Sequence, residues 1–469
     1  MNVKLILPAL AEAKGPYWRS IKYSLFPPLG LASLAAHLGP DDQVSLVDEH
    51  VEPVLTDDRP DVVGIETYIT SARRAYQLAD HYRARGSWVC LGGLHPTSLP
   101  QEAAAHADTV FVGPGEDTWP AFLADYRAGR PGKLYRSTTR DLTAQPPPRR
   151  DLIKSELYLV PNSLVVTRGC PHRCEFCYKE SFFAGGKSFY TRRVDQALAE
   201  IASLPGRHLF FLDDHLFGDA GFCSALFDGM RGMGRLWQAA GTVSSVLRGE
   251  LIAKAAACGL RSLFVGFETL SSAALAGMGK HHNFVDDYGQ AIRRLHELGV
   301  MINASFVFGA DQDDEWVFQH TVEWAIAQGI ETATFHILTP YPGTVLHQRL
   351  AAEGRILHRN WDWYDTRHAV FQPAGMTPQR LEEGYWQAYE DFYRWGSIFR
   401  SAAAKPTLRE MLRHVAYTGA WKKLEPFWNL LIRCRRVWRM RPAMERVLAG
   451  RTSAARRQIG GLIKPKDVV

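Results

Sequence analysis

TRGCPHRCEFCYKE, residues 167–180, is the stretch of this chain that decides both its fold and its chemistry. It places Cys170, Cys174 and Cys177 at the spacing C-x3-C-x2-C. The chain holds 7 cysteines among its 469 residues, so a chance match to this spacing has a probability of roughly 0.002. Thiolates this close together are soft ligands that suit an iron–sulfur cluster or zinc. The motif therefore indicates a metal centre.

Two kinds of metal centre fit these three cysteines. A structural zinc ion usually takes four protein ligands, and no fourth cysteine lies nearby, although His172 could complete such a site. On a four-iron cluster, three thiolates leave one iron open, and an open iron can chelate a small molecule through an amine and a carboxylate. An odd number of cysteines, three of them in one motif, also argues against a disulfide framework and for a reducing compartment.

The motif follows an apolar run directly, and similar runs recur along the next 170 residues. Helical segments separate them, so the pattern predicts six consecutive β/α units and a barrel, open or closed, with its chemistry at the carboxyl ends of the strands. The runs are NSLVVTRG (162–169), HLFFLDD (208–214), LWQAAGTVS (236–244), SLFVGFET (262–269), INASFVFG (302–309) and TATFHILT (332–339).

Strands and helices also alternate at the amino end, which predicts a second parallel, doubly wound sheet of five strands. Gly92, Gly93, Gly113 and Gly115 fall at strand ends, where they permit either tight turns or the close approach of a ligand. The polar segment that follows contains the breaker QPPPRRD (145–151) and predicts a linker. The predicted divisions are 1–135, a linker at 136–160, the barrel at 161–345, a post-barrel region at 346–400 and a basic helical tail at 401–469.

The cysteine spacing, placed after the first strand of six β/α units, resembles the radical SAM (S-adenosylmethionine) superfamily. The resemblance implies a [4Fe–4S] cluster on Cys170, Cys174 and Cys177 in a partial (β/α)6 TIM-type barrel. It also implies that the open iron binds SAM, that an electron from the cluster cleaves SAM to a 5′-deoxyadenosyl radical, and that a donor such as flavodoxin or ferredoxin supplies this electron. The positions that the resemblance assigns to SAM are Phe176, Asp213, Asp214, Ser244, Arg248, Glu268 and Gly309.

The acidic SAM positions have structural alternatives. The family commonly has Gly-Gly-Glu where this chain has the acidic pair, and Asp213 and Asp214 could instead cap a helix or form a turn. Ser245 adds a hydroxyl beside Ser244. Glu268 could form an ion pair at the barrel rim. The catalytic residues that act on the substrate stay unknown at this level.

The amino-terminal region resembles the Rossmann-like, cobalamin-binding domain that precedes the barrel in many radical SAM proteins. The positions assigned to cobalamin are Thr70, Ser71, Gly92, Gly93, His95, Gly113, Gly115 and Glu116. Proteins that ligate cobalt through histidine carry D-x-H-x-x-G, whereas this chain has Asp48 and His50 followed by Pro53. A lone histidine at a strand end is more often a surface residue, and this is the alternative for His50.

After the predicted barrel, the chain is first rich in aromatic residues and then, from residue 401, rich in Lys and Arg. Tyr341, Trp361, Trp363 and Tyr364 could line a substrate mouth or pack in a core. Residues 401–469 hold 16 Lys and Arg against 4 Asp and Glu, and a basic amphipathic helix is expected there. Its predicted apolar face is Phe427, Leu430, Leu431, Cys434 and Trp438. Such a helix either packs on the barrel or lies on an anionic membrane.

The beginning of the chain does not resemble a secretory signal, and no apolar stretch is long enough to cross a membrane. The expected location is therefore cytoplasmic, with peripheral membrane contact as an open alternative, and no nucleic acid is expected as a partner. The leading hypothesis is cobalamin-dependent methylation of an unactivated carbon in a small-molecule or lipid-like substrate. The alternatives are a radical cyclisation, rearrangement or carbon–carbon bond formation without methylation, and a non-enzymatic cluster or corrinoid sensor.

Overall fold

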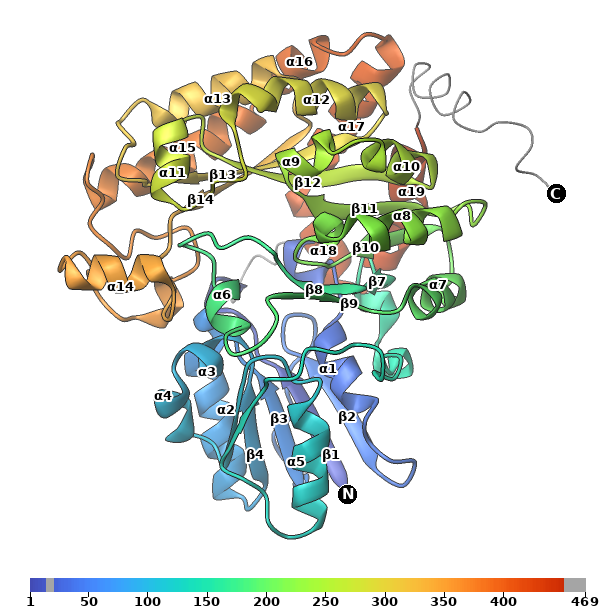
Figure 1. Ribbon diagram of the computed structural model, residues 1–469, viewed down its shortest axis with the longest axis vertical. Coiled ribbons are helices and arrows are strands. Elements are labelled where there is room, and N and C mark those ends of the chain that lie inside the picture. Colours follow the sequence, from blue (N-terminus) through green and yellow to red (C-terminus); the bar gives the residue numbers. More distant parts are fainter. Residues whose placement is uncertain (14–20, 451–469) are drawn as a thin grey trace.

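The computed structural model describes residues 1–13 and 21–450, which form two α/β domains and a carboxyl-terminal helical layer (Figure 1). The first domain is a six-stranded parallel sheet in the order β2-β1-β3-β4-β5-β6. Its strands are β1 (Asn2–Leu7), β2 (Gln43–Asp48), β3 (Val62–Glu66), β4 (Trp88–Gly92), β5 (Thr109–Val112) and β6 (Leu134–Arg136). Apolar clusters pack on both faces of this sheet, as a doubly wound sheet requires.

The helices of the first domain are α1 (Leu29–Ala35), α2 (Ala72–Ala84), α3 (Leu94–Ser98), α4 (Pro100–Ala104) and α5 (Thr118–Arg127). The sequence predicted five strands here, and β6 is a sixth that lies in the segment expected to be polar and irregular. Its three residues pair in parallel with β5, which extends the sheet to Arg136.

The second domain is an open six-stranded parallel sheet in the order β14-β13-β12-β11-β10-β7, so the predicted partial barrel is confirmed. The strands are β7 (Ser163–Leu164), β10 (His208–Phe211), β11 (Leu236–Gly241), β12 (Leu260–Glu268), β13 (Met301–Phe308) and β14 (Thr332–Ile337). The helices that follow the strands are α7 (Val194–Ser203), α8 (Ala220–Gly229), α9 (Val243–Leu247), α10 (Leu251–Ala257), α11 (Ser272–Gly277), α12 (Tyr288–Glu297) and α13 (Val317–Ala327).

The run before the cysteine motif is two strands rather than the single strand predicted. β7 belongs to the barrel sheet, whereas β8 (Thr167–Gly169) leaves it and pairs antiparallel with β9 (Phe189–Thr191). The break occurs because the carboxylate of Asp213 accepts hydrogen bonds from the backbone N–H groups of Val166 and Thr167, where a sheet partner would otherwise be. The motif therefore follows β8, a short hairpin strand that is not part of the barrel sheet.

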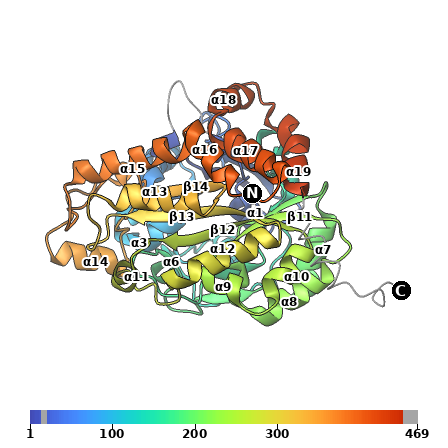
Figure 2. The same cartoon turned by 90° about the horizontal axis from the view of Figure 1, so that it is seen from above.

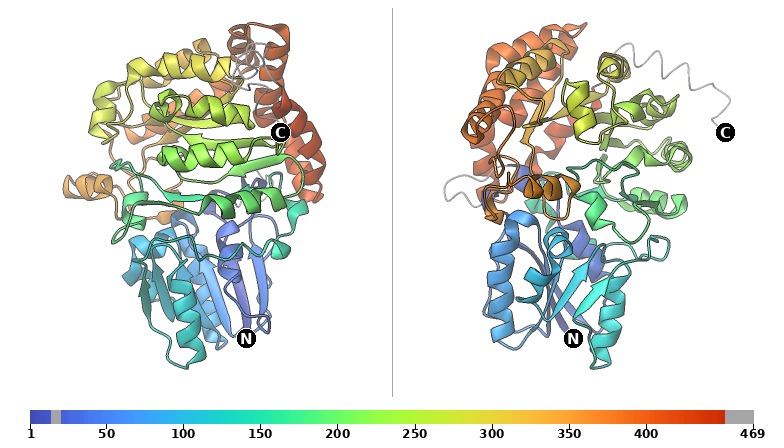
Figure 3. Two further views of the ribbon diagram at one scale, coloured as in Figure 1. Left: turned by 45° about the vertical axis from the view of Figure 1, so that its right-hand side comes forward. Right: turned by 60° about the vertical axis from the view of Figure 1, so that its left-hand side comes forward.

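Carboxyl-terminal helices cover the side of the second sheet opposite α8, α10 and α12 (Figures 2 and 3). They are α15 (Pro378–Tyr393), α16 (Trp395–Ala403), α17 (Leu408–Lys422), α18 (Glu425–Arg433) and α19 (Arg441–Ala449). The preceding helix, α14 (Val345–Ala352), lies apart from this layer and contacts the cysteine loop. The prediction of one amphipathic helix running to Trp438 is wrong. Arg435 adopts a left-handed backbone with φ 55°, so α18 ends there and a 3₁₀ turn follows. The last 19 residues of the basic tail lie outside the described residues.

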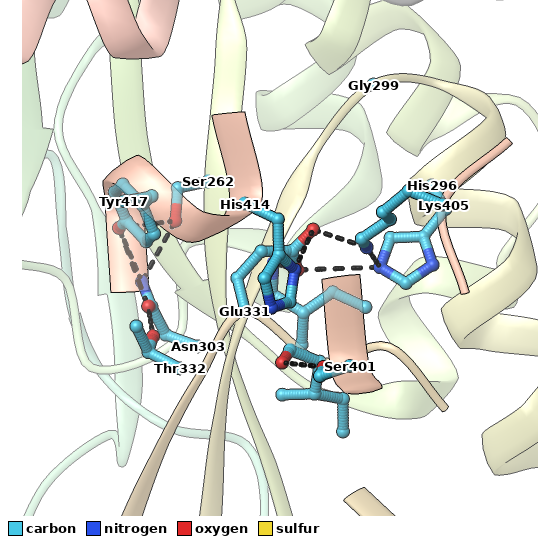
Figure 4. Close-up of polar contacts among 12 residues, drawn as sticks. Ser262, His296, Gly299, Asn303, Glu331, Thr332, Ser401, Lys405, His414 and Tyr417 are labelled. Carbon is cyan, nitrogen blue, oxygen red and sulfur yellow. Dashed lines mark hydrogen bonds and ion pairs between the residues drawn. The ribbon is translucent and has the colours of Figure 1, made fainter. Parts of the chain in front are cut away.

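A buried ion cluster fixes α17 and the segment before it to the amino-terminal end of the sheet (Figure 4). The Glu331 carboxylate lies 2.6 Å from Lys405 Nζ and 3.4 Å from His296 Nε2, and it accepts a hydrogen bond from the backbone of Ile302. His414 of α17 is buried 4.0 Å from the same carboxylate. These contacts make the helical layer part of the same packed unit as the barrel.

Candidate functional site

The backbone before the cysteine motif has room only for glycine at Gly169. This residue has φ 77°, and a Cβ atom there would lie 1.9 Å from the carbonyl oxygen of Ser188. The same carbonyl accepts a hydrogen bond of 2.9 Å from the N–H of Cys170. Such a close approach of two backbones is possible only without a side chain. The β8–β9 hairpin therefore sets the point at which the cysteine loop leaves the sheet.

Contacts with distant parts of the chain hold the rest of the loop. The N–H of Glu175 donates to the carbonyl of Met278 at 3.0 Å, and the N–H of Leu346 donates to the carbonyl of Glu175 at 3.0 Å. Cys177 N–H donates to the carbonyl of Cys174, which closes a tight turn between these two ligands. The partly buried Phe176 packs against the barrel core. The loop is thus supported by the barrel and by the start of α14.

The donor set of the loop fits an iron–sulfur cluster better than a single metal ion. All three cysteines are free thiols of intermediate burial. Among the described residues, no three His, Cys, Asp or Glu side chains gather closely enough to hold one ion, whereas ligands of a four-iron cube must be spread around it. His172, the alternative fourth ligand for zinc, stacks on His282 with ring centroids 3.5 Å apart. The three thiols therefore fit a cluster, and their role as its ligands stays a prediction.

Burial makes thiolate formation unfavourable until a cluster binds. It raises the pKa of Cys170 and raises that of Cys174 to about 12. A coordinating thiol is deprotonated outright by its metal, so a cluster bound by these thiols would displace their protons to solvent.

The two adjacent carboxylates after β10 both bind residues that lead into the cysteine motif. Asp213 is buried, and its Oδ1 atom accepts a hydrogen bond of 2.6 Å from the Thr167 hydroxyl, while its Oδ2 atom has no partner. Burial raises the pKa of Asp213 to about 7. Asp214 accepts a hydrogen bond of 3.0 Å from Gly169 N–H and pairs with Lys179 at 2.9 Å. Both residues therefore position the cysteine loop, and their assignment to SAM stays a prediction.

The remaining predicted SAM positions lie at the carboxyl ends of successive strands. Ser244 and Ser245 begin α9 after β11, and Ser245 Oγ joins the cap of that helix. Arg248 follows α9 and is exposed. Glu268 ends β12 with φ 69° and forms a buried ion pair with Lys280, which is the alternative that the sequence left open. A left-handed non-glycine residue at such a position is typical of functional sites.

Gly309 is predicted to lie close to bound SAM, but contacts within the protein offer another reason for a glycine at this position. Its φ is 102°, and a Cβ atom would lie 2.9 Å from the Leu381 side chain of α15. Its N–H donates to Asp313 at 2.8 Å. Packing and a turn thus account for this glycine.

The sequence pointed to His172 as an alternative zinc ligand but not to the group of histidines that it joins beside the motif. His172, His215 and His282 come from three different loops, and His172 lies 5.4 Å from His215 between ring centroids. Burial, with help from the charges of Lys280 and Arg248, lowers the pKa of His172, and burial lowers the pKa of His215 and of His282 to about 3. The three rings are therefore neutral at pH 7. The signal in the sequence was His215, directly after the acidic pair.

The carboxyl ends of the first sheet face the cysteine loop and α6 (Lys179–Phe182). In Figures 1 and 3 the strands of this domain run from the marked amino terminus toward the barrel. Gly113 lies where a Cβ atom would be 3.3 Å from the Phe182 carbonyl oxygen. Arg168, two residues before Cys170, pairs with Glu116 at 2.7 Å. The loops predicted to hold cobalamin therefore adjoin the loop predicted to hold the cluster.

Protein contacts explain the predicted cobalamin glycines, so these residues alone do not define a binding cradle. A Cβ atom on Gly93 would lie 2.9 Å from the Thr67 carbonyl, one on Gly115 would lie 3.1 Å from Leu34, and one on Gly92 would lie 3.4 Å from Phe111. Thr70 and Ser71 are buried in the turn after β3, where Ser71 Oγ accepts from the Tyr68 N–H. These positions stay predictions.

Orphaned polar atoms support a ligand at this junction more strongly. Thr67 Oγ1, His95 Nδ1 and Ser98 Oγ are buried without a hydrogen-bond partner on the side of the first domain. Ser181 Oγ is orphaned in the same way on α6, and α3 and α6 are in contact. Buried polar groups in proteins are normally satisfied. The residues present therefore fit a large polar-edged group, and cobalamin is such a group.

His50 is not available to cobalt. Its Nδ1 lies 2.7 Å from Asp48 Oδ1, and its Nε2 accepts a hydrogen bond of 3.1 Å from Leu10 N–H. Its ring stacks on Tyr23. The alternative of a surface residue is also wrong, since its side chain is 8% exposed.

The post-barrel aromatics join the two domains. Tyr364 is fully buried in a cluster with Ile69 of the first domain, and Tyr341 and Trp361 pack against this cluster. Trp361 Nε1 donates to Glu102 at 3.2 Å, and Glu102 also binds His95. Trp363 is 47% exposed. Most of this segment is therefore an interdomain core.

Comparisons with known proteins agree with this arrangement. Residues 23–123 match the family described as "B12 binding domain", and residues 164–325 match "Radical SAM superfamily". The chain is 29% identical over 394 residues to bacteriochlorophyllide d C-12(1)-methyltransferase of Chlorobaculum tepidum, covering 81% of this chain and 85% of the relative. It is 25% identical over 449 residues to hopanoid C-2 methylase of Rhodopseudomonas palustris, covering 87% and 84%. An anaerobic magnesium-protoporphyrin IX monomethyl ester cyclase of Rubrivivax gelatinosus is also 25% identical, with 78% and 74% covered.

Two solved structures share the whole arrangement of domains. The cobalamin-dependent radical enzyme OxsB superposes with a TM-score of 0.68 at 14% identity, covering 91% of this chain and 72% of that chain. The radical SAM methyltransferase TsrM of Kitasatospora setae superposes with a TM-score of 0.62 at 16% identity, covering 95% and 99%. These likenesses confirm the predicted fold.

The chain thus carries a B12-binding domain ahead of a radical SAM domain, and cobalamin-dependent radical SAM enzymes are among its structural neighbours. The two domains imply three cofactors: a [4Fe–4S] cluster, SAM and cobalamin. Among the described residues, no helix is both long and apolar enough to span a membrane.

Proposed function

We propose that this enzyme methylates an unactivated carbon of a small molecule in a cobalamin-dependent radical reaction. The observation that carries the proposal is the junction between the domains, where Arg168 beside the cysteine loop binds Glu116 of the B12-binding domain at 2.7 Å. A methyl group and a substrate radical must meet within bonding distance, so the two cofactor loops have to adjoin. The two relatives named as a methyltransferase and a methylase support the same chemistry.

The residues have distinct parts in this proposal. When bound, the cluster with SAM supplies a 5′-deoxyadenosyl radical and cobalamin supplies a methyl carrier. Cys170, Cys174 and Cys177 hold the cluster, and Asp213 and Asp214 hold the hairpin from which their loop begins. The interdomain core around Tyr364 excludes water from the junction, which protects a reactive radical.

Product analysis tests the methylation. The reconstituted enzyme is incubated with SAM labelled at its methyl group, a low-potential electron donor such as flavodoxin or ferredoxin, and candidate tetrapyrrole or hopanoid substrates. Methylation gives S-adenosylhomocysteine together with 5′-deoxyadenosine and places the label in a third product. A Cys177→Ala variant is the matched control and forms no deoxyadenosine. If wild-type protein binds no cobalamin by its absorption spectrum, the methylation proposal fails.

A radical reaction without methylation is the second candidate, because the cyclase from Rubrivivax gelatinosus is similar over most of this chain. In that case deoxyadenosine forms without S-adenosylhomocysteine. A non-enzymatic sensor would give neither product under reducing conditions.

The carboxyl-terminal helices support a further part of the proposal, which is contact with an anionic membrane surface. Leu424, Phe427, Leu430 and Trp438 are each more than 40% exposed. Exposed arginines follow on the same segment at positions 433, 435, 436 and 439. Exposed apolar side chains beside a dense positive charge complement a bilayer with anionic headgroups. Phe427, Leu430 and Trp438 belong to the predicted apolar face, whereas Leu431 of that face packs against a buried cluster.

Vesicle co-sedimentation tests the membrane contact. Wild-type protein is expected to sediment with phosphatidylglycerol vesicles at low salt and to be released at high salt. Leu430→Glu should weaken this binding, whereas Trp386→Glu, on α15 and also exposed, should not. Equal binding to neutral phosphatidylcholine vesicles would contradict the proposal.

A further inference from the structure

The concave face of the barrel sheet is not fully filled by the helices that cover it. A cavity of about 470 Å³ lies between the strands and α17, α18 and α19. Its volume is within the range of about 300 to 1,000 Å³ that is typical of pockets for drug-sized ligands. The cavity is called the helix-covered chamber below. It lies against the amino-terminal halves of β13 and β14 and reaches the carboxyl end of β10, where it meets Asp213, one of the predicted SAM positions.

The walls of the helix-covered chamber are mainly apolar. The sheet contributes Phe210 and Phe264, and the helical layer contributes Trp428, Met440 and Met444. The segments before β7 add more apolar side chains, namely Leu25, Phe26, Leu159 and Val160. Among the residues that the structure describes, no Lys or Arg lines the chamber. Walls of this kind favour a hydrocarbon-rich ligand over water.

One wall carries an uncharged polar patch. Tyr417 OH lies 3.4 Å from the amide nitrogen of Asn303 and 3.5 Å from Gln238 Oε1, and all three residues line the chamber. Figure 4 shows Tyr417 and Asn303 side by side with Ser262 and Thr332. The bonds of Tyr417 are long, so its hydroxyl can turn to a better partner at little cost. The patch can therefore bind one hydroxyl or carbonyl group of a ligand.

The chamber also reaches the support of the cysteine loop. Asp213 lines its end, and its Oδ2 atom is buried without a partner. The other carboxylate oxygen holds Val166 and Thr167, which lead into the motif. A ligand in the chamber thus lies against the residue that positions the cluster loop.

The opposite end of the chamber is near the surface. Trp421 lines the chamber and is 36% exposed, and Met440 lies two residues from the exposed Trp438. These helices are the ones that carry the exposed apolar and basic side chains described above. An apolar ligand can therefore enter beside that surface without crossing the polar junction of the domains.

We propose that the helix-covered chamber binds the apolar body of the substrate, an uncharged, hydrocarbon-rich molecule with a hydroxyl or carbonyl group. That this ligand is the substrate rests on the proposed function, but the binding itself does not require catalysis. The apolar walls supply most of the affinity, and the Tyr417 patch selects the polar group.

A fluorescence titration with N-phenyl-1-naphthylamine, an uncharged apolar probe, tests the binding in the full-length, cluster-reconstituted protein. The probe is expected to bind with enhanced emission and to be displaced by 1-dodecanol more effectively than by dodecanoate. Ala420→Phe and Ala240→Phe fill the chamber from its two sides and should each weaken probe binding at least tenfold. Ala403→Phe is the control, because Ala403 is exposed on α16 and does not line the chamber.

A second variant tests the polar patch. Tyr417→Phe removes one hydroxyl and should weaken displacement by 1-dodecanol about three- to tenfold while leaving probe binding unchanged. Unchanged probe binding in both filled variants, or an equal loss in Ala403→Phe, would overturn the proposal. Formation of 5′-deoxyadenosine without substrate is measured in parallel. If the wild-type protein forms no 5′-deoxyadenosine, this counts against the proposed function. The titration alone tests whether the chamber binds an apolar ligand.

Discussion

Replacing Gly169 with alanine should abolish cluster binding while the two domains stay folded. A left-handed backbone costs an L-residue roughly 1–2 kcal/mol. The new Cβ atom would also lie 1.9 Å from the Ser188 carbonyl, which belongs to the paired backbone, and overpacking of this kind adds about 1–3 kcal/mol. Losing the hydrogen bond from Cys170 N–H to that carbonyl adds about 1 kcal/mol.

These terms total about 3–6 kcal/mol, which exceeds what a three-residue hairpin at the edge of the barrel gains from its pairing. The hairpin should therefore open and displace Cys170 from the other two ligands. Iron and sulfide per chain are measured after anaerobic reconstitution, with circular dichroism as the check on folding. Gly185→Ala is the matched control, because Gly185 has φ 82° in the same connection and nothing lies within 4 Å of its added Cβ atom. A full cluster in Gly169→Ala would refute the reasoning.

Three further variants test the packing around the site. Lys280→Met leaves the buried Glu268 without its partner and should lower the unfolding free energy by about 3–5 kcal/mol; Glu268→Gln added to it should restore part of the loss, and no restoration would contradict a direct pair. Burial lowers the pKa of His414 to about 4, so the unfolded chain binds a proton that the folded chain does not. Denaturant titrations should therefore show the stability from this residue intact above pH 6.5 and falling by about 3 kcal/mol toward pH 4, and His414→Gln should flatten this part of the profile. Trp428→Ala should cost about 3–5 kcal/mol and expose the helical layer to protease, whereas the exposed Trp438→Ala should change stability by less than about 0.5 kcal/mol; equal effects would be inconsistent with the described packing.

The order of the domains and the cluster ligands could be predicted because their signals are local. The spacing of the three cysteines lies within eight residues, and alternating apolar runs report parallel strands at any position along the chain. The split between β7 and β8 could not be predicted in this way. It depends on Asp213, which lies 46 residues after Thr167 and replaces a sheet partner there.

The same limit applies to the site. His172, His215 and His282 meet only because three loops end at the same edge of the sheet. Gly309 and Gly115 stay predicted ligand positions, and their contacts with Leu381 and Leu34, which a local sequence pattern does not show, offer a second reason for a glycine. The break in the basic helix occurs at Arg435, which carries no glycine or proline signal.

The central claim is that the cluster loop and the B12-binding loops face one another across the domain junction. Electron paramagnetic resonance of reconstituted protein, with the cluster reduced and cobalamin in its cob(II)alamin form, measures this directly. Each signal should be broadened by dipolar coupling to the other, and the broadening should be lost when either cofactor is left out. Two sharp, independent signals in protein loaded with both cofactors would contradict it.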